Sequence, residues 1–141
     1  MTTIKLYSTT GKEIDPHGVN HPAHYNTDPS GVECIEVVRH LSFNWGSAFK
    51  YAFRAGKKDL TGDMLESELK DLKKAVWYLT DEQQSNSFWT NRTAKYKDEL
   101  LRIIASREGH LKSFFESVYH LNLITAKAFI LAEIQRLEKS D

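Results

Sequence analysis

The sequence contains a single cysteine, three prolines and no excess of charge of either sign. Cys34 alone cannot form an intramolecular disulfide or a thiolate zinc site, so a reducing compartment is expected. The 19 basic and 19 acidic side chains cancel to a formal net charge of zero, whereas domains that bind nucleic acid are usually strongly basic. We therefore expect no sequence-specific nucleic-acid partner.

Long apolar runs are also missing. No run has the length of a transmembrane helix, and the first residues lack the apolar segment of a signal peptide. These absences predict a cytoplasmic protein with no membrane partner. The 141 residues are enough for one domain with one hydrophobic core.

The three prolines all lie before residue 30, as do Gly11 and Gly18. This composition predicts an irregular amino-terminal arm over residues 1–30. Within the arm, Ile4–Tyr7 is typical of a short strand and Thr10–Lys12 of a turn. The arm therefore has room for a short strand or a hairpin.

Apolar residues recur at helical spacing after residue 30, which predicts an all-α helical bundle. The predicted helices cover about residues 32–41, 44–55, 64–79, 93–106, 111–120 and 124–138. Polar residues 81–87 are the expected linker between a three-helix core at 31–80 and a carboxy-terminal helical extension at 88–141. The extension has more apolar surface than one small core needs, so we expect a homo-oligomer.

Between Glu36 and Asp59 every charged side chain is basic. The spacing of Lys50, Arg54 and Lys57 places them on one face of the second predicted helix. Such a row favours phosphate binding, although a solvated cationic face is the alternative. No Walker A loop and no Gly-x-Gly-x-x-Gly motif accompanies it.

Acidic pairs flank this basic segment: Glu33 with Glu36 before it, and Glu68 with Asp71 after it. If their helices pack together, the carboxylates could meet and bind Mg²⁺ or Mn²⁺ beside a substrate phosphate. The same spacing is common on solvated helices. The pattern resembles the all-α nucleotide pyrophosphohydrolases of the MazG type, which implies cleavage of nucleoside triphosphates to monophosphate and pyrophosphate.

Three histidines, His17, His21 and His24, have a spacing that zinc ligands can show. No cysteine accompanies them and Pro22 stiffens the segment, so we favour packing or a nucleotide contact over zinc. Cys34 lies on the apolar side of its predicted helix, which indicates a core residue and not a nucleophile.

Four short motifs follow one another in the chain: His21–Tyr25, Gly31–Glu36, Lys50–Asp59 and Asp71–Leu79. In this order they resemble a small phage domain family, often labelled a domain of unknown function, that includes the early-gene nucleotide kinase of a lytic podophage. The resemblance covers about residues 20–80. It implies a phage protein in the cytoplasm of the infected host that transfers a phosphoryl group to deoxynucleoside monophosphates without a Walker A loop.

This hypothesis gives each group of residues a role. The catalytic residues would be Lys50, Arg54, Lys57 and Asp71, which hold phosphates and neutralise charge that develops during transfer. The nucleotide would be bound by His21, His24, Tyr25, Lys58, Lys74, Trp77 and Tyr78. Mg²⁺ would be held by Glu33, Glu36, Glu68 and Asp71.

Two other functions fit the same residues. A MazG-like hydrolase would use the acids first and the basic face second, and would release pyrophosphate from one nucleotide. A non-catalytic protein would bind a nucleotide to sequester a signal or to modulate a host enzyme. In either case residues 88–141 could also serve as a host-protein interface.

Overall fold

The computed structural model describes residues 28–55, 57, 63–85 and 95–139, and the backbone of two short strands at 6–7 and 13–14. Strand β1 (Leu6–Tyr7) pairs antiparallel with β2 (Glu13–Ile14), with Leu6 opposite Ile14 and Tyr7 opposite Glu13. Two residues of the strand expected at Ile4–Tyr7 are therefore in a strand. The remaining predictions for residues 1–27 lie outside the described residues.

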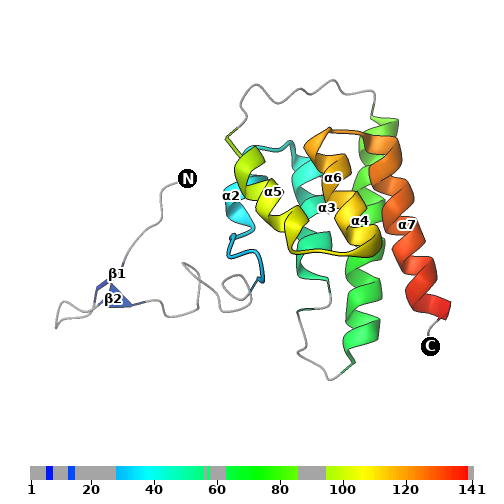
Figure 1. Ribbon diagram of the computed structural model, residues 1–141, viewed down its shortest axis with the longest axis horizontal. Coiled ribbons are helices and arrows are strands. Elements are labelled where there is room, and N and C mark those ends of the chain that lie inside the picture. The colour runs from blue at the N-terminus through cyan, green and yellow to red at the C-terminus, as the bar shows by residue number, and fades with distance from the viewer. Residues whose placement is uncertain are drawn as a thin grey trace.

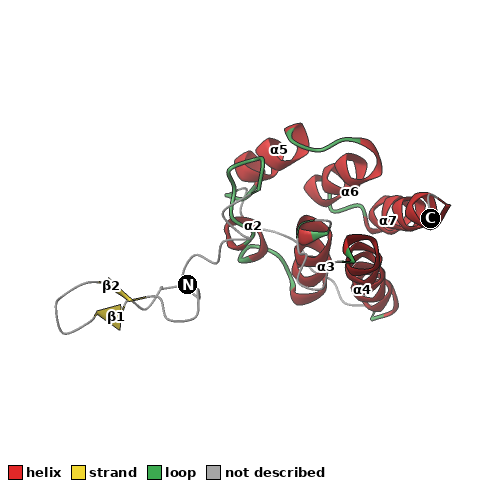
Figure 2. Ribbon diagram, turned by 90° about the horizontal axis from the view of Figure 1, so that it is seen from below, coloured by secondary structure: helices red, strands yellow, loops and turns green. Residues whose placement is uncertain are grey.

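Six helices make up the rest of the described chain, which confirms an all-α bundle (Figure 1). They are α2 (Ile35–Val38), α3 (Phe43–Arg54), α4 (Met64–Gln84), α5 (Lys97–Ala105), α6 (Gly109–Tyr119) and α7 (Leu123–Lys139). Figure 2 shows α3 and α4 side by side in one layer and α5, α6 and α7 in the other, with α2 between α3 and α5. No helix in the described ranges is both long and apolar enough to span a membrane.

Side chains at the helix starts explain where α3 and α4 begin. The Ser42 hydroxyl accepts a hydrogen bond from the backbone N–H of Trp45, and the Asp63 carboxylate accepts one from Glu66 at 2.9 Å. Each bond satisfies a backbone donor that the helix itself leaves without an acceptor. The two helices run antiparallel, because residues late in α3 contact residues early in α4.

The first predicted helix, at residues 32–41, is much shorter in the structure. Only Ile35–Val38 is α-helical, and tighter turns flank it, with backbone bonds from Glu36 to Glu33 and from His40 to Val37. Hydrogen bonds between residues three apart wind the chain more tightly than an α-helix does. The helical spacing of apolar residues in the sequence therefore extends further than the α-helix itself.

The predicted linker at residues 81–87 is also wrong in part, because α4 continues through Gln84. The Asn44 amide in α3 donates to Asp81 at 3.0 Å and to Glu82 at 3.2 Å. On the other side of α4, Lys127 in α7 donates to Gln83 at 3.3 Å. Hydrogen bonds to two neighbouring helices thus hold a polar stretch in helical form.

One hydrophobic core joins the two halves of the chain. Phe49 of α3 packs edge-on against Phe115 of α6, with ring centroids 5.3 Å apart. The apolar stripes of the last helices, at Phe114, Val118, Ile130, Ile134 and Leu137, are buried in the same core as Leu72 and Leu79 of α4. These stripes pack within the chain, so they no longer argue for a homo-oligomer, which stays a prediction.

Candidate functional site

Three cations surround the ring of Tyr51 on the face shared by α3 and α4. The Lys50 Nζ lies 4.8 Å from the ring centroid, the Arg54 Cζ 4.9 Å and the Lys74 Nζ 5.2 Å. We call Tyr51, Lys50, Arg54 and Lys74 the Tyr51 cation cluster. The negative face of an aromatic ring attracts cations, so Tyr51 holds together three side chains that would otherwise repel each other.

Aromatic rings continue from this cluster along α4. Tyr51 stacks on Tyr78, with centroids 5.9 Å apart and an interplanar angle of 12°. The Tyr78 ring in turn makes T-shaped contacts with the rings of Trp77 and Phe43. Trp77 is 62% exposed and Phe43 76% exposed, so two large apolar rings face solvent directly beside the cations.

Arg54 differs from the two lysines because it is already paired. Its Nη2 and Nε lie 3.2 and 3.3 Å from the two oxygens of Asp71, a buried side chain. This two-point contact fixes the orientation of the guanidinium. Neither Lys50 nor Lys74 has a carboxylate partner among the described residues, so their charges are available to a ligand.

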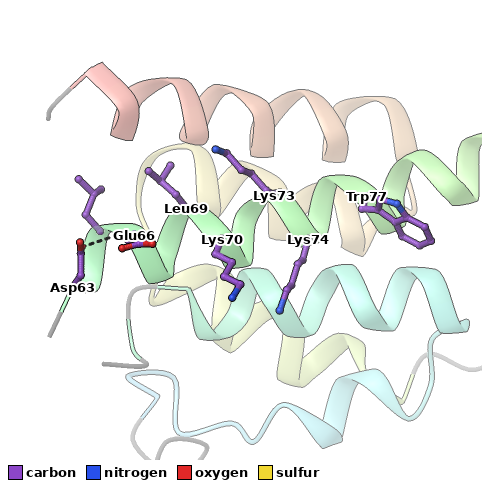
Figure 3. A pocket seen from close by; sticks show the side chains of 8 residues that line it. Asp63, Glu66, Leu69, Lys70, Lys73, Lys74 and Trp77 are labelled. Atoms are coloured by element: carbon purple, nitrogen blue, oxygen red, sulfur yellow. Dashed lines mark hydrogen bonds between the residues drawn. The ribbon is translucent and has the colours of Figure 1, made fainter. Parts of the chain in front are cut away.

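A hollow of about 800 Å³ runs along the exposed side of α4. Figure 3 shows Lys70 and Lys74 directed toward α3, Lys73 directed toward α7 and Trp77 at the far end. The described residues that line it are Asp63, Leu65, Glu66, Leu69, Lys70, Lys73, Lys74 and Trp77. The hollow shares Lys74 with the Tyr51 cation cluster and Trp77 with the aromatic rings, so these three features form one continuous surface.

Lys57 does not join this surface, which corrects the predicted row of Lys50, Arg54 and Lys57. Helix α3 ends at Arg54, so the chain has left the helical path by residue 57. The Lys57 Nζ contacts Oδ1 of Asp28 and lies 3.8 Å from the ring centroid of Phe53.

The acidic residues predicted to bind a metal face different neighbours. Asp71 faces α3 and pairs with Arg54, whereas Glu68 interacts with Glu133 and Arg136 of α7. Burial, with a smaller contribution from the Glu133 carboxylate, raises the pKa of Glu68. Within the described ranges no three His, Cys, Asp or Glu side chains are grouped as a metal site would need.

The other predicted metal ligands, Glu33 and Glu36, lie at the start of α2. The Glu36 carboxylate accepts a hydrogen bond of 2.7 Å from the backbone N–H of Glu33 and so stabilises the local turn. Cys34 between them is buried, and burial raises the pKa of its thiol to about 12 even though Lys50 and Arg54 favour the thiolate. A buried thiol with a raised pKa agrees with the prediction that Cys34 is a core residue and not a nucleophile.

Several predicted nucleotide ligands cannot be placed. His21, His24, Tyr25 and Lys58 lie outside the described residues, as does His17. The structure brings together Lys50, Arg54, Asp71, Lys74, Trp77 and Tyr78 from the predicted set.

Sequence reasoning missed Tyr51, Asp28 and Arg107. Tyr51 lies next to Lys50 and three residues before Arg54, and an aromatic residue beside two cations on one helix was a signal that could have been used. Asp28 and Arg107 are 79 residues apart and meet only through the fold, so no local pattern connects them.

Comparison with known proteins gives a single finding for this chain. No curated protein and no solved structure matches it. The four motifs at residues 21–25, 31–36, 50–59 and 71–79 all lie in the segment that does match. Residues 19–80 match the model of the family DUF3310, which is described as a protein of unknown function.

Proposed function

We propose that the α3–α4 face binds a nucleotide and that the protein transfers a phosphoryl group to a deoxynucleoside monophosphate. The observation that carries the proposal is the Tyr51 cation cluster with the exposed Trp77 beside it. A nucleotide has a phosphate that needs cations and a base that stacks on an aromatic ring. The surface supplies both, since Lys74 and Trp77 line the same hollow and are three residues apart on one helix.

In this proposal the phosphate lies against Lys50, Arg54 and Lys74. The two lysines supply point charges, and Arg54 uses the N–H donors that Asp71 leaves available. Asp71 is a positioning residue here, because it contacts the guanidinium and holds the remaining donors in a fixed direction.

The base stacks on Trp77. Stacking of one base on an aromatic side chain contributes about 1–3 kcal/mol. Because Trp77 is largely exposed, it can meet a base without displacing any part of the hydrophobic core. The Tyr78 ring lies between the rings of Trp77 and Phe43 and contacts both, so it extends the aromatic surface beside Trp77.

The proposed donor is a nucleoside triphosphate. A phosphate oxygen of the monophosphate attacks the γ-phosphorus, the bond from that phosphorus to the β–γ bridging oxygen breaks, and the products are a deoxynucleoside diphosphate and a nucleoside diphosphate. The cations offset negative charge on the transferred group. Because Glu33, Glu36, Glu68 and Asp71 do not gather in the structure, no step of this proposal uses a metal held by them.

The test is incubation of the full chain with deoxynucleoside monophosphates and ATP, with and without Mg²⁺, followed by separation of the products. Appearance of a deoxynucleoside diphosphate supports the proposal. Pyrophosphate released from one nucleotide overturns it in favour of a MazG-like hydrolase. Nucleotide binding without any product overturns the transfer step and indicates a non-catalytic nucleotide-binding protein.

Two variants connect the activity to this surface. Lys74→Gln removes one phosphate contact, so we expect kcat/KM to fall about tenfold or more, equivalent to about 1.4 kcal/mol. Trp77→Ala removes the stacking surface and should raise KM. Lys112→Gln, which removes the same charge from an exposed site on α6, is the matched control and should leave both constants unchanged.

A further inference from the structure

A second group of cations lies beyond the carboxyl end of α3. Lys57 follows the last turn of α3, Arg107 lies between α5 and α6, and both contact Asp28. The Nη2 and Nη1 atoms of Arg107 lie 2.6 and 3.3 Å from the two Asp28 oxygens. Both cations also lie over the ring of Phe53, at 3.8 Å for the Lys57 Nζ and 5.3 Å for the Arg107 Cζ.

This cluster has one more positive charge than negative charge. Asp28 is completely buried at its side chain and also accepts hydrogen bonds from the backbone and hydroxyl of Ser30. A single carboxylate can neutralise only one of the two cations. Arg107 takes both carboxylate oxygens, which leaves Lys57 with a contact to an oxygen that is already shared.

The ammonium of Lys57 likewise lacks negative charge and acceptors of its own. Its Nζ is buried, and the Asp28 oxygen that it contacts is the one that Arg107 Nη2 also uses. Burial, together with the charge of Arg107, lowers the pKa of Lys57 to about 7, although contact with Asp28 favours the charged form. An ammonium has three N–H donors, and one shared carboxylate oxygen does not match all of them, so this position favours a ligand that brings further acceptors and negative charge.

Parts of the Lys57 and Arg107 side chains reach the surface, whereas the Asp28 side chain does not. The Lys57 side chain is 20% exposed and that of Arg107 10%, against 0% for Asp28. The Lys57 Nζ itself is buried, so an anion reaches the ammonium when this long side chain turns outward from Asp28. Phosphate oxygens match both groups, since guanidinium binds them through paired N–H donors and an ammonium acts as a point charge.

We propose that Lys57 and Arg107 form a second phosphate-binding site, in which Asp28 partly neutralises the cations and competes with the ligand for them. The site is separate from the Tyr51 cation cluster, because Tyr51 and Phe53 point to faces of α3 about 200° apart. Arg107 comes from the part of the chain that the family match at residues 19–80 does not cover.

Direct phosphoryl transfer needs the donor and acceptor phosphates in contact, so a site on another face of α3 does not hold the second substrate of the proposed reaction. Phosphate binding at Lys57 and Arg107 therefore does not rest on the proposed function, and the two ideas can fail independently.

The experiment measures phosphate binding by isothermal titration calorimetry in a chain that carries Lys50→Gln and Lys74→Gln. This background removes the two unpaired lysines of the Tyr51 cation cluster and leaves Arg54 paired with Asp71, so the added Lys57 and Arg107 variants assign the binding that remains. Inorganic phosphate and a deoxynucleoside monophosphate are titrated separately, each against chloride at equal ionic strength. We expect binding in this background, and at least a tenfold loss of affinity when Arg107→Gln or Lys57→Gln is added.

Asp28→Asn is the sharpest variant, because a phosphate site and a purely structural cluster predict opposite results. Removing the competing carboxylate should tighten phosphate binding at least threefold, whereas a structural cluster would only lose stability. Arg102→Gln, which removes the same positive charge as Arg107→Gln from an exposed position in α5, is the control for the two cation variants and should leave phosphate affinity unchanged. Circular dichroism checks that each variant is folded. If Asp28→Asn does not fold, the effect of Lys57→Gln on phosphate affinity decides whether the second site exists.

The outcomes separate the two proposals. No phosphate binding in the Lys50→Gln/Lys74→Gln background, or binding unaffected by Lys57→Gln, overturns the second site even if the wild-type chain forms a diphosphate. Binding that depends on Lys57 and Arg107 supports the site even if the wild-type chain has no kinase activity. Binding of the monophosphate as well identifies a nucleotide phosphate as the ligand, and binding of inorganic phosphate alone identifies the free ion.

Discussion

The side chains of Arg54 and Asp71 show how the same residues serve stability and the proposed site. They are 16% and 6% exposed, so the pair has been removed from most of its solvent. Desolvation of two charges offsets much of their attraction, but removal of one partner leaves the other charge buried and unpaired. A loss of activity in an Arg54 variant would therefore mix unfolding with lost phosphate binding, which is why Lys74 is the better test.

Arg54 and Asp71 should therefore behave as a coupled pair in unfolding experiments. Asp71→Leu and Arg54→Met should each lower the free energy of unfolding by about 3–5 kcal/mol, because each strands a largely buried charge. The double variant Arg54→Met/Asp71→Leu should be far less destabilised than the sum of the two single changes. Urea unfolding followed by circular dichroism measures all of these values. Additive losses in the double variant would show that the pair does not act as a unit.

Lys57 makes the stability of the protein depend on pH. Its folded pKa of about 7 is below the ordinary lysine value of 10.5, so between these values the unfolded chain binds more protons than the folded one. Stability therefore increases as pH rises through this window. In the Lys57→Gln variant this contribution should be absent, so the stability of wild type relative to the variant should grow from pH 7 to about 10. A constant difference across this range would contradict the lowered pKa.

At the scale of single elements, α4 shows why helix ends are hard to predict. The residues from Asp81 to Gln84 have the composition of a linker, and sequence periodicity gives no reason to extend the helix through them. Their hydrogen bonds to Asn44 and Lys127 come from residues about 40 positions away in the chain. The existence of α4 could be predicted from its apolar stripe, whereas its last turn depends on tertiary contacts.

The Asn44 contact can be tested directly. Asn44→Ala should cost about 1 kcal/mol and increase amide exchange at the end of α4, because the carboxylates of Asp81 and Glu82 lose a donor. Asn44→Asp should cost more, since it places a third carboxylate beside them. Native-state hydrogen exchange at residues 81–84 is the measurement. Equal exchange in both variants and wild type would mean that the amide does not hold this turn.

At the scale of the whole molecule, the parts that the sequence could predict are those with local signals. The helical periodicity indicated the bundle, and the acid-free segment indicated Lys50 and Arg54. The remaining features need the fold: α7 packs against α4, and Arg107 reaches Asp28 from the other half of the chain. For the same reason the predicted gathering of four acids does not occur, because Glu68 and Asp71 face different neighbours.

The shared core also bears on whether residues 31–80 can fold alone. Phe49 packs on Phe115, and Leu72 and Leu79 are completely buried in the cluster that includes Ile130. Without α5, α6 and α7 these side chains would lie exposed, and a large buried aliphatic or aromatic side chain contributes about 1.5–3 kcal/mol. Proteins are stable by only about 5–15 kcal/mol, so the loss of several such contacts exceeds the margin.

We therefore predict that a chain ending at residue 87 loses cooperative unfolding, although it keeps every motif of the family match. Thermal unfolding should change from a single sharp transition in the full chain to a broad, non-cooperative one, and a dye that binds exposed apolar surface should become fluorescent. Adding residues 88–141 as a separate peptide is the control, because recovery of the transition would show that the missing contacts were the cause. A sharp transition in the shortened chain alone would instead establish residues 31–80 as an independent three-helix domain.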